Sequence, residues 1–164
     1  MRNHFGMFVA FAIVIATGCN APAPEAEVFD RQAVEAEVSD WLDVFWATWS
    51  EGIEGFDRGM ALYDNHPDYS FAAWGSLWLS YTAVSEAFRP GFETIQQQTF
   101  EFEQTAITVL DRDLVYTAHQ GTWSQSYADG TTSEAKPLAI TMLLVRSDGL
   151  WKARFSHLSV PATE

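Results

Sequence analysis

Three side chains of this sequence could carry out acid–base chemistry: His119, His157 and Asp68. An imidazole titrates near neutral pH, so a positioned histidine can accept and donate a proton, and Asp68 or Tyr69 could assist it. Each residue also has a structural interpretation. His119 could be an exposed or hydrogen-bonded residue of a sheet, and His157 could bridge the last strand to the first helix. Asp68, with His66 nearby, lies in the sequence Asp-Asn-His-Pro-Asp, which is typical of a turn.

His157 lies in a segment, 148–159, that predicts a turn followed by a final strand. The opening Asp-Gly pair favours a tight hairpin turn, and the residues after it alternate. Alternation puts Trp151, Phe155 and His157 on one face. The apolar run at 138–146 is the predicted antiparallel partner. We therefore expect His157 to point into an apolar interior.

His119 lies on a second predicted strand, 114–127. Alternation places it on the same face as Gly121 and Trp123. We favour that face as the wall of a pocket, because two large residues separated by a glycine suit a cavity lining. An exposed or hydrogen-bonded position in the sheet is the alternative for His119.

Aromatic residues are abundant, with 12 Phe, 7 Trp and 5 Tyr in 164 residues. Such a composition excludes a disordered chain and indicates a core or cavity walled by rings. Core packing is the alternative role for much of this set. The residues expected to line a ligand pocket are Trp46, Trp49, Tyr69, Trp74, Trp123, Thr141 and Phe155.

The chain length suits one α+β domain at residues 30–160, followed by a short tail at 161–164. Asp30 is a candidate N-cap, and apolar residues recur after it at helical spacing. Turn residues separate the later alternating runs. The predicted helices are 30–52, 56–63 and 83–88, and the predicted strands are 69–75, 76–80, 98–109, 114–127, 138–146 and 150–159.

Residues 1–18 are typical of a bacterial lipoprotein signal peptide. An apolar core at 8–15 is too short to span a bilayer, and it is followed by small residues and Cys19. Cys19 would be lipidated, and 19–29 would be an extended tether. Because Asn20 is not aspartate, we expect the periplasmic face of the outer membrane. An ordinary secretory signal is the alternative.

The final strand also resembles a known family. Asp-Gly-x-Trp, an alternating run and a late His-x-Ser are similar to the end of SnoaL-like domains, within the nuclear-transport-factor-two-like superfamily. The order of predicted elements over residues 30–160 fits the same family. The resemblance implies a cone: a curved antiparallel sheet wrapped around three N-terminal helices, with an internal apolar pocket. It also implies pairing into a homodimer.

The resemblance does not extend to the ketosteroid isomerases of that superfamily. Their general base would fall at Ala73, their oxyanion tyrosine near Phe45 and their protonated carboxylic acid near Ala139. Alanine cannot accept a proton, and phenylalanine cannot donate a hydrogen bond to an enolate. The sequence therefore disfavours an isomerase of that mechanism.

Composition and spacing also exclude several classes of partner. A net charge of −13, with 9 Lys and Arg, argues against binding to nucleic acid. We find no metal-ligand spacing, phosphate loop or Rossmann pattern, so we expect neither a metal nor another cofactor.

Three functions stay open. The first is a lipid-anchored protein that binds a small apolar or aromatic molecule, with His157 as polar anchor. The second is a small-molecule lyase, isomerase or cyclase that uses a pocket histidine as general acid/base. The third is a dimeric interaction module without a ligand. We favour binding, because a fold alone does not establish an activity.

Overall fold

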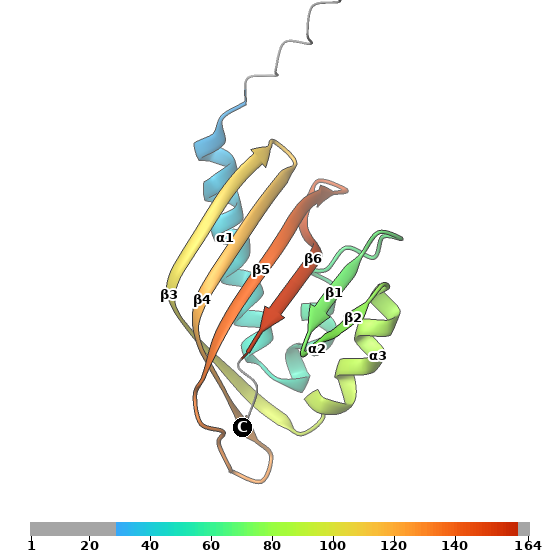
Figure 1. The fold of residues 1–164 in the computed structure, drawn as a ribbon, viewed down its shortest axis with the longest axis vertical. Coiled ribbons are helices and arrows are strands. Elements are labelled where there is room, and N and C mark those ends of the chain that lie inside the picture. The colour runs from blue at the N-terminus through green and yellow to red at the C-terminus, as the bar shows by residue number, and fades with distance from the viewer. Residues whose placement is uncertain (1–28, 161–164) are drawn as a thin grey trace, which may run out of the picture.

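The computed structural model of the chain describes residues 29–160. The predicted leader, Cys19, the tail and all of the tether except Phe29 lie outside these residues. Helices precede the long strands, which confirms the predicted α+β class (Figure 1). The elements are α1 (Arg31–Ser50), α2 (Ile53–Met60), β1 (Ser70–Ala73), β2 (Ser76–Trp78), α3 (Tyr81–Phe92), β3 (Ile95–Asp111), β4 (Leu114–Tyr127), β5 (Lys136–Ser147) and β6 (Leu150–Ser159).

The first helix, α1, forms as its sequence pattern predicts. The carboxylate of Asp30 accepts hydrogen bonds from the backbone N–H groups of Gln32 and Ala33, at 3.0 and 3.1 Å. This N-cap satisfies donors that the helix itself leaves unpaired. The apolar stripe is buried against the sheet and consists of Val34, Val38, Leu42, Phe45 and Trp49.

The sheet is curved, and its strands have the order β2-β1-β6-β5-β4-β3. Neighbouring strands are antiparallel except β1 and β6, which are parallel. The four long strands are antiparallel as expected, and the parallel pairing of β1 with β6 makes the sheet as a whole mixed. α1 runs behind the long strands and leaves the opposite face of the sheet uncovered (Figure 1). Within residues 29–160, no helix is long and apolar enough to cross a membrane.

Two helices differ in extent from the prediction. The helix expected at 56–63 begins earlier, at Ile53, and also ends earlier, at Met60. It ends before Tyr63 because Tyr63 forms a parallel bridge with Ala153 of β6. The helix expected at 83–88 continues through Pro90. A proline removes one backbone donor, and near the end of a helix only the final turn is affected.

The sheet bends where β3 crosses β4 at Gly121. The register between these strands shifts between Phe102 and Gln104, so that Glu103 is an extra residue in β3. A β-carbon on Gly121 would lie 1.9 Å from the carbonyl oxygen of Glu101. Only glycine allows this close approach, and bulges of this kind bend a strand. The bend makes the inner face of the sheet concave.

A second irregularity lies in β6 and changes which residues face inward. Leu143 pairs with Phe155, but Leu144 pairs with Ala153, so Arg154 is an extra residue. Alternation restarts after this bulge, and Ser156 becomes buried. The expectation that Phe155 and His157 share the inner face with Trp151 is therefore wrong.

The extra residue is held by an ion pair. Arg154 donates from Nε and Nη2 to Oδ2 of the buried Asp64, at 2.8 and 2.5 Å. The backbone beside it is paired too: Ala153 N–H donates to Leu62 O at 3.0 Å, and Asp64 N–H donates to Ala153 O at 2.9 Å. The segment 62–64 is thereby fixed onto β6 at the bulge.

Candidate functional site

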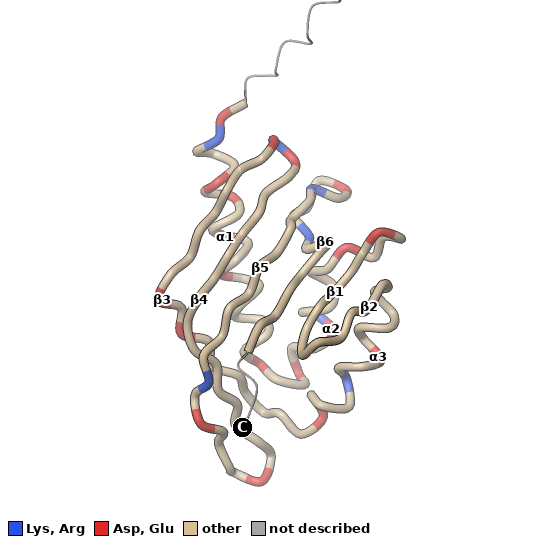
Figure 2. The backbone as a smooth tube through the Cα atoms, viewed as in Figure 1, with Lys and Arg blue, Asp and Glu red and all other residues tan. Residues whose placement is uncertain are grey.

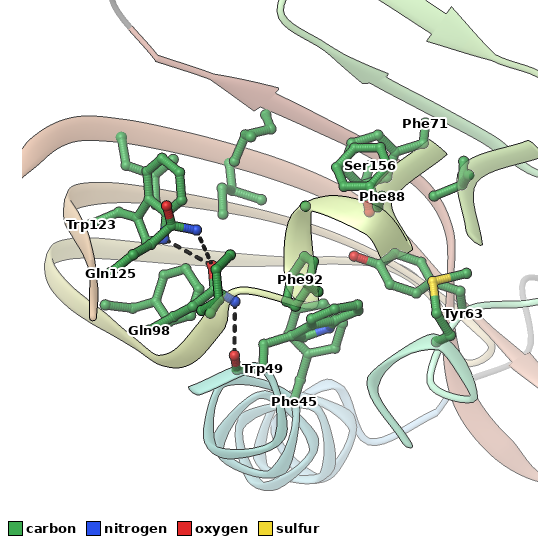
Figure 3. A pocket seen from close by; sticks show the side chains of 18 of the residues that line it. Phe45, Trp49, Tyr63, Phe71, Phe88, Phe92, Gln98, Trp123, Gln125 and Ser156 are labelled. Atoms are coloured by element: carbon green, nitrogen blue, oxygen red, sulfur yellow. Dashed lines mark hydrogen bonds between the residues drawn. The ribbon is translucent and has the colours of Figure 1, made fainter. Parts of the chain in front are cut away.

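A cavity of about 510 Å³ lies between the helices and the concave face of the sheet. Half of the residues that line it are aromatic, and Figure 3 shows rings converging from α1, α3 and the strands. The aromatic lining residues are Phe45, Trp46, Trp49, Tyr63, Phe71, Trp74, Trp78, Phe88, Phe92, Phe100, Trp123 and Tyr127.

The pocket wall is electrically neutral. Among the described residues that line it, none is Asp, Glu, Lys, Arg or His. Transfer of a charged group from water into such a site is costly, because no opposite charge compensates for the lost hydration. The pocket therefore suits an uncharged molecule.

One polar cluster in the wall is satisfied by its own hydrogen bonds. Gln98 donates from Nε2 to the carbonyl oxygen of Trp49 at 2.8 Å, and its Oε1 accepts from Trp123 Nε1 at 3.0 Å. Gln125 donates from Nε2 to Gln98 Oε1 at 3.3 Å (Figure 3). Gln125 also accepts a hydrogen bond from the Tyr127 hydroxyl at 3.0 Å. This network fixes the Trp123 ring. No pattern in the sequence indicates that these two glutamines line the cavity.

A second polar pair, Tyr63 and Ser156, lines another part of the pocket. Ser156 is 2% exposed, and its hydroxyl makes no hydrogen bond of ordinary length and angle with a described residue. The Tyr63 hydroxyl points toward it (Figure 3). Burial raises the pKa of Tyr63, and the neighbouring Ser156 hydroxyl offsets this only in part, so Tyr63 stays protonated. Alternation without the bulge assigned Ser156 to the outer face, which is why it was missed.

The structure places four of the predicted pocket residues in the wall: Trp46, Trp49, Trp74 and Trp123. Trp74 lies at the mouth, since it lines the pocket and is also 55% exposed. Trp74 and Gly75 form the β1–β2 turn, and both have positive φ angles, 48° and 75°. The centroid of the Trp74 ring lies 5.4 Å from that of the Phe88 ring.

The other three predicted pocket residues lie elsewhere. Tyr69 is buried in the core, where its ring contacts those of Tyr63 and Tyr81. Thr141 is on the outer side of β5, because alternation turns its neighbours Ile140 and Met142 inward. Phe155 follows the β6 bulge, which turns its side chain to the outer face of the sheet, away from the cavity.

His119 faces the inner side of β4, as alternation indicates, but it does not line the cavity. It is 3% exposed, and its ring packs edge-on against Trp46 at 5.2 Å. Thr105 and Thr117 lie within hydrogen-bond distance of its two ring nitrogens, at 3.1 and 3.2 Å. Burial lowers the pKa of His119 to about 4, so the imidazole is neutral near pH 7.

His157 and Asp68 are both remote from the cavity. His157 is exposed on the outer face, where it pairs in register with Ala72 and Thr141. Asp68 is exposed in the turn before β1, where its backbone N–H donates to His66 Nδ1 at 3.1 Å. The turn interpretation thus describes its position. No cluster of three or more potential metal ligands occurs in the part of the chain that the structure describes.

Comparison with protein families gives a match over most of this domain. A family model described as a SnoaL-like domain matches residues 53–163, which include the whole sheet and most of the pocket wall. The chain belongs to the SnoaL-like family. No curated protein sequence matches the chain.

Solved structures share the fold of this SnoaL-like domain. A nuclear transport factor 2-like superfamily protein from Salmonella enterica is 15% identical, with a TM-score of 0.67 over 82% of this chain and 95% of that one. A proposed dehydratase from Streptomyces avermitilis is 12% identical, with a TM-score of 0.68 over 82% and 100%. A proposed scytalone dehydratase from Novosphingobium aromaticivorans is 10% identical, with a TM-score of 0.67 over 80% and 86%. At these identities the similarity shows the fold alone.

We predict that His119 makes the SnoaL-like domain less stable as the pH falls from 6.5 toward 4. The unfolded chain titrates near 6.5 and the folded chain near 4, so between these values only the unfolded state binds the proton. Stability is lost on acidification, by roughly 2 kcal/mol between about pH 7.5 and about pH 5. Urea unfolding at the two pH values measures this loss.

The variant His119→Gln should lose most of that pH dependence, because an amide does not titrate. His157→Gln is the matched control, and it should keep the dependence because His157 is exposed. Equal pH dependence in wild type and His119→Gln would show that His119 is not the titrating group.

Proposed function

We propose that this SnoaL-like domain binds a small, uncharged, apolar or aromatic molecule in its cavity. The observation that carries the proposal is a cavity of about 510 Å³ in which half of the lining residues are aromatic and none of the described lining residues is charged. Its volume is within the range of about 300–1,000 Å³ that is usual for small-molecule sites. Binding of an apolar ligand in such a preformed apolar cavity is favourable, because the apolar surface of the ligand is removed from water.

The geometry gives less support to a lyase, isomerase or cyclase that uses a pocket histidine. A general acid or base must reach the reacting atom within about 2.6–3.2 Å or through one water. Trp46 packs against His119 on the cavity side, His157 lies on the outer face, and Asp68 is in an exposed turn. Phe45 and Ala73, which stand where a ketosteroid isomerase would have its oxyanion tyrosine and its general base, cannot act as acid or base. Binding therefore remains the preferred proposal.

We predict that the uncharged fluorescent probe N-phenyl-1-naphthylamine binds the purified domain with increased emission, and that naphthalene displaces it. 2-Naphthoate should displace it poorly, because its carboxylate would be desolvated without a partner. Ala87→Trp, which adds a ring to the lining, should weaken probe binding about tenfold through overpacking. Fluorescence titration measures both effects.

Ala47→Trp is the matched control for added aromatic bulk, since Ala47 is exposed on α1 and does not line the cavity. It should bind the probe like the wild type. Displacement by 2-naphthoate as effective as that by naphthalene would contradict a neutral site.

We also propose that the domain is anchored through Cys19 at the periplasmic face of the outer membrane. The support is the sequence alone: the apolar run at 8–15, the small residues after it and the cysteine. Stable membrane anchoring takes more than one acyl chain, and Cys19 is the residue that would carry them. Replacing Cys19 by Ser should therefore abolish acylation and release the protein in soluble form. Labelling with radioactive palmitate and cell fractionation measure this, and an unlabelled wild type would refute the anchor.

The uncovered face of the sheet supports pairing of two copies. Its central positions carry no Asp, Glu, Lys or Arg, although the chain has a net charge of −13 (Figure 2). Like-charged copies can approach closely only where such charges are absent. The outward residues are Tyr116, Ala118, Gln120, Thr122, Ala139, Thr141, Leu143, Phe155 and His157.

We predict a dimer at micromolar concentration and a monomer for Thr141→Glu, because a two-fold interface would bring the new carboxylates close together. Static light scattering measures the mass. Leu150→Glu is the control, since Leu150 is exposed at the end of the β5–β6 hairpin, and it should remain dimeric. A monomeric wild type would exclude this pairing.

A further inference from the structure

The Ser156 hydroxyl is a polar group that the folded chain leaves incompletely paired inside an apolar wall. It is almost fully buried, lines the cavity and makes no hydrogen bond of ordinary length and angle with a described residue, although the Tyr63 hydroxyl interacts with it. An unpaired buried hydroxyl is unfavourable, because its hydrogen bonds with water have not been replaced. A ligand atom in the cavity could replace them.

The other polar groups of the lining do not offer the same opportunity. Gln98 and Gln125 are engaged with one another and with Trp123 and Tyr127. Trp49 Nε1 is also buried without a partner, but Trp49 packs with the adjoining atom, Cε2, against Gly59 of α2, where an added β-carbon would be only 2.7 Å away. Ser156 is therefore the strongest candidate for contact with a ligand.

Two neighbours define the surroundings of Ser156. The Tyr63 hydroxyl points toward it, and burial keeps that hydroxyl protonated and able to donate (Figure 3). Phe71 of β1 is its register partner and presents an aromatic ring to the same cavity. Hydroxyls donate and accept, so this corner matches a hydroxyl or a carbonyl oxygen attached to an apolar framework.

We propose that the ligand is a neutral ring compound with a hydroxyl or carbonyl oxygen, and that this oxygen hydrogen-bonds to Ser156 with Tyr63 beside it. This rests on the proposed binding function and narrows its ligand class. A carboxylate is excluded from the class, because no cationic side chain is among the described lining residues.

The test compares 2-naphthol with naphthalene as competitors of N-phenyl-1-naphthylamine, in the wild type and in Ser156→Ala. The substitution should weaken 2-naphthol about fivefold, the value of one hydrogen bond, and leave naphthalene unchanged. Ser156→Thr keeps the hydroxyl and should retain the preference for 2-naphthol. Ser159→Ala, an exposed position on the same strand, should behave like the wild type.

A thermal melt without ligand separates this role from a structural one. Ser156→Ala removes a hydroxyl that makes no hydrogen bond of ordinary geometry, so the melting midpoint should change by less than about 2 °C, whereas loss of a well-formed structural hydrogen bond would lower it by several degrees. If naphthalene binds but Ser156→Ala affects both competitors equally, the inference is overturned and the binding function stands. If neither the probe nor naphthalene binds the wild type, the binding function itself fails and the inference with it.

Discussion

The buried ion pair between Asp64 and Arg154 is the interaction on which the arrangement of the pocket depends. Arg154 is the extra residue of the β6 bulge, so its side chain is free from the alternation of the strand and reaches the carboxylate. A carboxylate with so little exposure needs such a partner, because an unpaired buried charge is strongly destabilising. The bulge and the ion pair therefore support one another, and the faces of β6 beyond residue 154 follow from them.

The same contact positions both hydroxyls of the proposed ligand corner. Pairing of 62–64 with Ala153 fixes Tyr63 outside α2 and against β6. The bulge one residue further on turns Ser156 toward the same space. Two residues 93 positions apart in sequence, 156 − 63, thus come together through one local irregularity. The bend at Gly121 contributes separately, by making the inner face concave enough to leave a cavity.

Local signals in the sequence predicted what depends on local physics. Asp30 caps α1, and Asp148 and Gly149 have the positive φ values, 52° and 78°, that a tight hairpin requires. Alternation along β4 correctly predicts that His119 and Trp123 point to the inner face, because no bulge interrupts β4 between them. The order of helices and strands followed from such signals together with the family resemblance.

The position of His157 could not be predicted in this way. Its face depends on the bulge at Arg154, and the partner that makes the bulge favourable, Asp64, is 90 residues away. Alternation is a strictly local rule, and a single extra residue reverses every assignment after it. Ser156 was missed for the same reason. Gln98 gave no signal either, since its burial depends on accepting from Trp123 across the strand pair.

The neutrality of the cavity is itself a constraint in so acidic a chain. Charges in Figure 2 gather on the helices and turns, on β3 and on β6, while β4 has no Asp, Glu, Lys or Arg and β5 has none between Lys136 and Arg146. Two surfaces result, a concave one that encloses the cavity and the outer face of the sheet, and the same strands supply both. Successive residues of a strand point to opposite faces of the sheet. The absence of charged residues from β4 and from the middle of β5 therefore leaves both faces uncharged at these positions. The proposed neutral ligand on one side and the proposed second copy on the other would impose the same requirement on these strands.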